Sequence, residues 1–360
     1  ATTVSTRKHK YVITIDFAKE SNNKIYNGEV PYPFSKSYTD TVSVFGNKII
    51  IVAQRSNKVK ISGIFENYTS AIYTQIVKAL VYYYCISGEA IEISDISLDY
   101  FYKSELKATH RIENKNINQI VSKTEQLSIL KNLNHDAVNV IFEETQRGHS
   151  YLIALTHLVK SYCSESPYDA FERKWKAFNA VYRQVSGLET EFKRQSFVRK
   201  DLVDNPEHYP LIIDEVNKLN TDTIRSKVRW IKFIHNNFST IKQAENYKNF
   251  VLSNDDYRLA EINQSTITVR EDFLKEKGFY EDVTAHLADI ISNKRINNSH
   301  LAATLCIKYM YFVRNKSVHA EKIDSSFRLT ALSKEENEII WLSNLLDLLL
   351  IDLVNGHEHF

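Results

Sequence analysis

The stretch LAATLCIKYMYFVRNKSVHA, residues 301–320, runs from an almost wholly apolar segment into Arg314, Asn315 and His319. Its apolar residues recur at the spacing of a buried helix, so we predict a helix over residues 299–315. A permanent cation and a titratable imidazole then lie five positions apart, where this helix becomes polar. The stretch therefore predicts both a core helix and a candidate site at its end.

The composition restricts the class of protein. A chain of 360 residues that is 43% hydrophobic has enough apolar material for about two globular domains. Only 8 Gly and 5 Pro favour long helices over a turn-rich sandwich or barrel. The formal charge of +2 means that any nucleic-acid surface must be a local patch.

Cysteine usage and hydropathy point to the cytoplasm. Cys85, Cys163 and Cys306 fit no zinc or disulfide spacing, so we expect reduced thiols, no metal and no cofactor. No apolar core follows the basic residues at the start, and we expect no signal peptide. The most apolar stretch, residues 339–355, is interrupted by Asp347 and Asp352. We expect a helix buried in a core or a subunit interface, and no membrane span.

Residues 1–115 are predicted to form an α+β domain. Alternating or short apolar runs predict strands at 11–17, 48–53, 59–65 and 90–101, and helical spacing predicts a helix at 69–86. The polar stretch 110–118 is the expected linker.

Residues 116–360 are predicted to be mainly helical. Helices are expected at 120–133, 135–147, 149–163, 169–186, 189–203, 209–219, 222–238, 241–252, 281–293, 299–315 and 335–355. Ser333, with Glu336 three residues later, forms a capping box for the last helix.

Three Arg–His pairs have four or five residues between them: Arg229–His235, Arg295–His300 and Arg314–His319. Their contexts separate them. Arg229 lies inside a predicted helix whose apolar residues account for its packing, and Arg295 lies in a predicted loop before the next helix. Arg314 follows the long apolar helix, has Tyr311 three residues before it and is followed directly by Asn315. The third pair is therefore the candidate site.

A second segment, YDAFERKWKAFNAVYRQV at residues 168–185, is an amphipathic helix with Phe171, Trp175 and Phe178 on one face. Asn179 fits that packing role less well than its neighbours. Together the two segments resemble HEPN-domain ribonucleases, including Apea-like bacterial defence proteins. That family carries Tyr-x-x-Arg-Asn-x-x-x-His in one helix and Phe, Trp and Ala-Phe-Asn-Ala in an earlier one.

The resemblance implies a HEPN-like nuclease core at about 150–186 and 299–355. The helices at about 189–293 are then an insertion, because the two segments lie further apart than in a compact member. It also implies a homodimer that cleaves single-stranded RNA without metal and leaves a 2′,3′-cyclic phosphate. His319 would be the general acid/base, Arg314 would stabilise the phosphorane, and Asn315 would position the phosphate or the imidazole. Asn179 and Tyr311 would support the site.

The residue types suit this chemistry. RNA supplies its own 2′-OH nucleophile, so the site needs a proton carrier near neutrality and a cation for phosphate oxygens, which His and Arg provide. An offset of five residues places the two side chains roughly 140° apart on an unbroken helix. Either the helix ends near Asn315, or the site forms at an interface between two chains.

The family's setting implies a role in phage defence or toxin-type growth arrest. The resemblance also implies that residues 1–115 form a sensor or regulatory domain, which senses a trigger or restrains cleavage. A phage-derived trigger or an antitoxin protein would then be a further partner.

Two basic segments are candidate RNA-binding surfaces. DTIRSKVRWIKFIHNNF, residues 222–238, sets Arg225, Arg229 and Lys232 in a stripe beside an apolar face and Trp230. FKRQSFVRK, residues 192–200, is the second. An ordinary solvated helix face is the alternative for both segments.

Two other functions fit the sequence. The chain can be a catalytically silent HEPN-like scaffold that binds a partner protein or nucleic acid. It can also be an unrelated helical regulator whose nucleic-acid face is the helix at 222–238, in which case His319 is dispensable.

Overall fold

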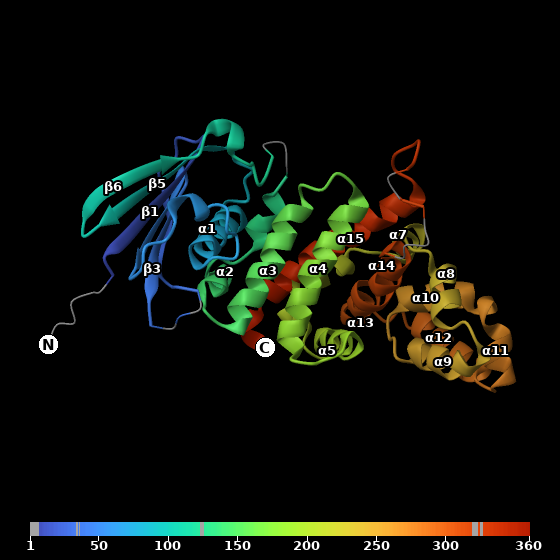
Figure 1. Cartoon of the computed structure of the whole chain (residues 1–360). Coiled ribbons are helices and arrows are strands. Elements are labelled where there is room, and N and C mark those ends of the chain that lie inside the picture. Colours follow the sequence, from blue (N-terminus) through green and yellow to red (C-terminus); the bar gives the residue numbers. More distant parts are fainter. Residues whose placement is uncertain (1–6, 34, 36, 123–125, 319–322, 325–326) are drawn as a thin grey trace. The chain divides into compact units, whose positions relative to one another are not determined.

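The computed structural model describes residues 7–33, 35, 37–122, 126–318, 323–324 and 327–360. The chain forms two compact units, which share the long helix α4 (Pro167–Ser186). The first unit comprises residues 1–164 and 176–184, and the second comprises residues 165–175 and 185–360. An antiparallel sheet near the N-terminus is followed by a largely helical region, as the sequence predicts (Figure 1).

The first unit contains a six-stranded antiparallel sheet in the order β2-β3-β4-β1-β5-β6. The strands are β1 (His9–Phe17), β2 (Lys24–Pro31), β3 (Thr39–Phe45), β4 (Lys48–Arg55), β5 (Ile93–Tyr102) and β6 (Glu105–Arg111). In the central strand β1, Tyr11, Ile13 and Ile15 are buried and alternate with half-buried residues. This alternation gives the sheet one apolar face for the helices.

Three strands were not predicted, and one predicted strand is wrong. β5 and β6 are joined by Lys103 and Ser104, both at positive φ (49° and 69°), which is the backbone of a type I′ turn. Such turns usually carry Asn or Gly, so the Lys-Ser pair gave no signal and the start of β6 was missed. Residues 59–65, predicted as a strand, instead form a single 3₁₀ turn at Ile61–Gly63.

Helix α1 (Ala71–Ser87) packs on the sheet and is capped by Ser70, whose side chain accepts the backbone N–H of Tyr73. Its consecutive residues Tyr82, Tyr83, Tyr84 and Cys85 are all buried. A helix buried all round needs cover on the side away from the sheet, and α2 (His135–Val138) and α3 (Gln146–Ser161) supply it. The unit therefore extends to Ser164, whereas the sequence placed the boundary at 115/116.

The second unit is helical. Besides the first part of α4 it contains α5 (Glu191–Asp204), α6 (Pro210–Asn217), α7 (Thr221–Lys227), α8 (Trp230–Asn237), α9 (Ala244–Leu252), α10 (Tyr257–Thr266), α11 (Glu271–Glu276), α12 (Tyr280–Ser292), α13 (Asn298–Ala303), α14 (Met310–Val318) and α15 (Lys334–Asn355). A π-helical segment, Thr304–Tyr309, joins α13 to α14 without a break.

Several helix predictions are corrected. The helix predicted at 120–133 is wrong, since the described residues of that range, 120–122 and 126–133, form only a 3₁₀ turn, at Ser128–Asn132. The single helix predicted at 222–238 is two, α7 and α8, because the chain is extended at Val228. Helices α10 and α11 were not predicted. The prediction for residues 335–355 is confirmed by α15.

Helix α15 is buried on most sides, and the three acidic residues that interrupt its apolar sequence are buried with it. Asp347 pairs with Lys174 of α4 at 2.9 Å, and Asp352 accepts the backbone N–H groups of Leu211 and Ile212 at the start of α6. Glu338 is held by Arg229. Each buried carboxylate is thus matched to a donor, as burial of a charge requires. No helix within the described residues is both long enough and apolar enough to cross a membrane.

Replacing Asp347 by Ala should destabilise the protein by about 3–5 kcal/mol, because the Lys174 ammonium would be left buried without its carboxylate. Urea unfolding measures the loss. The matched control is the double variant Lys174→Met/Asp347→Leu, which removes both charges and should recover much of that stability. A single variant as stable as the wild type would show that the pair does not stabilise the fold.

Asp352 should make stability depend on pH. Burial raises the pKa of Asp352 to about 7, although the N–H groups of Ile212 and Leu211 oppose this. The folded protein therefore holds a proton that the unfolded chain loses near pH 4, and this contribution is lost as pH rises through 7. Between pH 5 and pH 8, wild type should lose on the order of 2 kcal/mol relative to Asp352→Asn. Parallel stability curves for the two proteins would contradict the assignment.

Candidate functional site

Arg314 lies in α14, whose inner face is fixed by the buried side chains of Met310, Phe312 and Val313. The Arg314 guanidinium is half-buried, and its Nη1 donates to Oδ1 of Asn315 at 3.0 Å. Among the described residues it has no carboxylate partner. An arginine held at the surface in this way is available to an anion.

His319, the predicted acid/base, lies outside the described residues. Helix α14 nevertheless continues through Val318, so the helix does not end near Asn315. How His319 lies relative to Arg314, and whether a second chain completes the site, stay predictions.

The other two arginines of the Arg–His pairs are already neutralised. Arg229 Nε donates to Glu338 at 2.5 Å and its Nη1 donates to Glu335 at 3.1 Å. Arg295 is ion-paired with Asp255 and Asp289. Of the three arginines, only Arg314 has no carboxylate among the residues that the structure describes.

His300 has a structural role, as its position in α13 suggests. Its Nδ1 accepts the backbone N–H of Asp255 at 2.9 Å. Burial lowers the pKa of His300, against the opposing charges of Asp255 and Asp256. A neutral ring that accepts a backbone hydrogen bond stabilises the fold. The Arg295–His300 pair is therefore structural, unlike the candidate pair Arg314–His319.

A buried cluster of Arg229, Tyr309 and Glu338 supports the helix that carries Arg314. The Tyr309 hydroxyl donates to Glu338 and accepts the backbone N–H of Arg229 at 2.6 Å. Burial alone would lower the pKa of Arg229, but the Glu338 carboxylate reverses this and raises it. Burial raises the pKa of Glu338 even against the Tyr309 and Arg229 hydrogen bonds. The cluster joins the α7–α8 corner, the π-helical segment and α15.

Within the second unit, the first part of the earlier HEPN-like segment, up to Trp175, contacts the segment that carries Arg314. The Trp175 ring of α4 lies 6.2 Å from the Tyr311 ring, centroid to centroid, and Phe171 lies 6.3 Å from Trp175. Tyr311, a predicted supporting residue, therefore packs against the earlier helix, one turn before Arg314. This contact joins segments that lie more than a hundred residues apart in sequence.

Asn179, the other predicted supporting residue, belongs to the part of α4 assigned to the first unit. Its Oδ1 is buried and accepts no hydrogen bond within the described residues. A buried acceptor without a donor is costly. The contact between Asn179 and the Arg314 site stays a prediction.

The three predicted RNA-binding residues do not form one stripe. Arg225 is exposed on α7 and paired with Asp222 at 3.1 Å, and Lys232 is exposed on α8. Arg229 lies at the corner between these helices, where its side chain is only 14% exposed and points to Glu338. Its guanidinium stabilises the fold and is not displayed to solvent.

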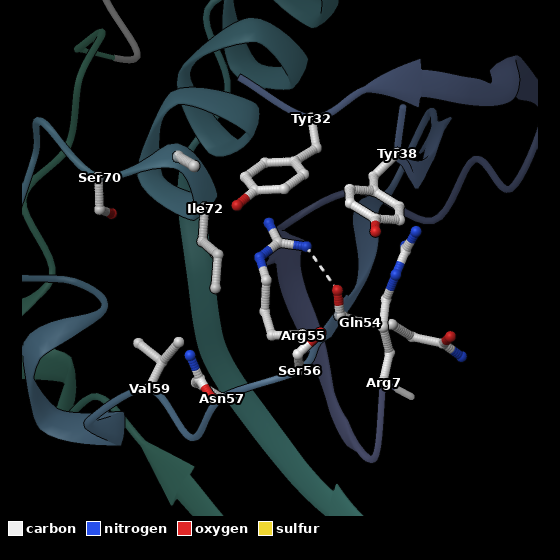
Figure 2. Close-up of a pocket in the computed structure, with 11 residues that line it drawn as sticks. Arg7, Tyr32, Tyr38, Gln54, Arg55, Ser56, Asn57, Val59, Ser70 and Ile72 are labelled. Atoms are coloured by element: carbon white, nitrogen blue, oxygen red, sulfur yellow. Dashed lines mark hydrogen bonds between the residues drawn. The ribbon is translucent and has the colours of Figure 1, made fainter. Parts of the chain in front are cut away.

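The first unit has a pocket of about 410 Å³ in which arginines meet tyrosines (Figure 2). The Arg7 guanidinium lies 3.5 Å from the centroid of the Tyr38 ring, and that of Arg55 lies 4.2 Å from the centroid of Tyr32. Arg55 also makes a two-pronged ion pair with Asp40, at 2.6 and 3.0 Å. Because Asp40 neutralises Arg55, this pocket is a weaker anion site than its arginines suggest.

The chain matches no family model, no curated protein and no solved structure. The HEPN resemblance therefore stays a prediction that depends on the residues of the two segments.

Sequence reasoning did not identify a cavity on α5 and the π-helical segment, lined by Arg199 and Lys308. The basic segment 192–200 signalled Arg199, but Lys308 was hidden within a run of apolar residues. Only the tertiary structure places the two together.

Substitution of Arg229 by Ala should destabilise the protein by about 3–5 kcal/mol, because Glu338 would keep its buried charge without its main partner. The exposed residues Arg225 and Lys232 are matched controls, whose replacement should change stability by less than about 0.5 kcal/mol. Urea unfolding measures all three variants. If Arg229→Ala kept full stability and lost only RNA affinity, the prediction that Arg229 belongs to an RNA-binding stripe would be correct after all.

Proposed function

We propose that this chain is a metal-independent endoribonuclease of the HEPN type, which cleaves single-stranded RNA at a site built from Arg314, Asn315 and His319. The observation that carries the proposal is that the Arg314 guanidinium is not ion-paired with any described carboxylate. It is the arginine of the three Arg–His pairs that has no carboxylate within the described residues. It also lies on a helix held rigidly from behind by buried side chains.

The roles follow from the chemistry of each group. The Arg314 guanidinium binds the non-bridging oxygens and stabilises the charge that develops on the phosphorane. The His319 imidazole takes the 2′ proton and, as imidazolium, protonates the leaving 5′ oxygen. The Asn315 amide already accepts from Arg314, so it orients the guanidinium before RNA binds.

A homodimer completes the site in this proposal. Two side chains five residues apart lie roughly 140° apart on an unbroken helix. Because α14 is helical as far as Val318, we propose that a second copy brings the imidazole to the cation. The connection between α14 and α15 carries four exposed apolar side chains: Ile323, Phe327, Leu329 and Leu332. Such side chains, close in sequence to positions 314 and 319, suit burial in an interface.

The biological setting comes with the resemblance. A ribonuclease of this type would act in the cytoplasm, in phage defence or growth arrest. The first unit would respond to a phage-derived trigger or bind an antitoxin protein.

Substitution of Arg314 or His319 by Ala should lower the rate of RNA cleavage by at least about 100-fold, because each change removes charge stabilisation or proton transfer. The assay incubates purified full-length protein with single-stranded RNA and EDTA, and mass spectrometry identifies 2′,3′-cyclic phosphate ends. Lys316→Ala removes a cation from the same helix and is the matched control.

Light scattering should give the same dimer mass for wild type and both variants. Wild-type cleavage by either variant would refute the assigned roles. RNA that stays intact but shifts in a mobility gel would instead support the silent scaffold.

A further inference from the structure

A cavity of about 610 Å³ lies within the second unit, between α5, α8, α9 and the π-helical segment. It adjoins a second hollow of about 360 Å³, and Arg199 and Lys308 line both. The larger cavity also reaches Tyr311, one helical turn before Arg314. Its volume is within the range of small-molecule sites.

Neither cation in this cavity has an acidic partner among the described residues. No residue that lines the larger cavity is acidic. The adjoining hollow is lined by one acidic residue, Asp204, and its carboxylate is already ion-paired with Lys200. The Lys308 ammonium lies 4.8 Å from the centroid of the Phe250 ring, which offsets only part of its lost hydration.

The two cations also repel each other. Burial and then the charge of Arg199 lower the pKa of Lys308 to about 8, and burial lowers the pKa of Arg199. Two partly buried like charges without a counter-ion destabilise the empty protein. A bound anion would remove that cost.

A third side chain supports an anionic ligand independently. Gln195 is only 9% exposed and lines the cavity, and its Nε2 has no hydrogen-bond acceptor among the described residues. Buried amide donors are nearly always satisfied. The Nε2 atom is itself covered, so Gln195 would donate to a ligand in the cavity after its side chain turns toward it.

The backbone and the rim add two features. Lys308 lies in the π-helical segment, and such wide turns are frequent at functional sites. Phe192 lines the same cavity and is 80% exposed, so its ring is open to a flat partner. Asn246 and Asn249 of α9 place two further amides on the wall.

We propose that this cavity binds a nucleotide by its terminal phosphate monoester. Arg199 and Lys308 neutralise the phosphate, which carries close to two negative charges at neutral pH. Gln195 donates to the phosphate, the base stacks on Phe192, and the asparagine amides reach its polar edge. The site is distinct from Arg314 and does not depend on RNA cleavage.

The phosphate can belong to a free nucleotide or to the 5′ end of an RNA, and calorimetry on the full-length protein distinguishes them. The probes are adenosine 5′-monophosphate, adenosine, and one RNA hexamer with either a 5′-phosphate or a 5′-hydroxyl. Tighter binding of the phosphorylated member of either pair supports the site and identifies its source. Equal binding of the two members within both pairs, or no binding of any phosphorylated probe at millimolar concentration, would overturn the proposal.

The variants Arg199→Met and Lys308→Met keep much of the apolar stem and should each weaken binding of the preferred probe at least 10-fold. Lys277→Met removes an exposed charge at the end of α11, away from the cavity lining, and should leave affinity unchanged. Unliganded Lys308→Met should melt at a higher temperature than wild type, because it loses a desolvated charge beside Arg199. The probe should then raise the melting temperature of wild type but not of this variant. Equal affinity in wild type and both cavity variants would refute the site.

Affinity should fall as pH rises above about 8, where Lys308 loses its proton. The other charged groups facing it are Arg199, which stays cationic, and the Lys200–Asp204 pair. His300 also lines the adjoining hollow, and its lowered pKa keeps it neutral in this range. Lys308→Met should abolish this pH dependence, and a dependence that persists in the variant would exclude Lys308 as its source.

Discussion

The buried cluster of Arg229, Tyr309 and Glu338 is the constraint on which the second unit depends. Three segments meet there: the corner between α7 and α8, the π-helical segment and α15. A buried carboxylate is tolerated only with a cation and further donors, so none of the three segments can move without leaving a charge or a hydroxyl unsatisfied. Since α14 continues directly from the π-helical segment, the cluster also fixes the direction from which Arg314 leaves the core.

The same reasoning explains the acidic residues of α15. Asp347 and Asp352 are each matched to one donor set, Lys174 in one case and the first backbone N–H groups of α6 in the other. These contacts tie α15 to α4 and to α6 by geometry as well as by apolar packing. A helix of leucines alone could rotate or slide against its neighbours, whereas paired carboxylates specify one register.

Whether a cation is already paired distinguishes structural residues from functional candidates in this chain. Arg229, Arg295 and Arg55 are held by carboxylates within the described residues, and each stabilises its surroundings. Arg314 and the Arg199–Lys308 pair are not held in this way, and two of these three residues are desolvated. Because a partly buried cation without a counter-ion is unfavourable, we propose anions as the partners of these three residues.

The sequence by itself determined the helices with long apolar periodicity, such as 299–315 and 335–355, and the alternating strands β1 and β5. Hydrophobic period is a local property that the fold must satisfy. The sequence also identified Arg314 as a candidate site residue, because it lies at the end of an apolar helix. Only tertiary structure decided that Arg229 is a core residue, that residues 222–238 break into two helices, and that Arg199 and Lys308 share a cavity. Each of these depends on a partner distant in sequence, Glu338 for the arginine and α5 for Lys308, and no local pattern encodes which distant group a charge will meet.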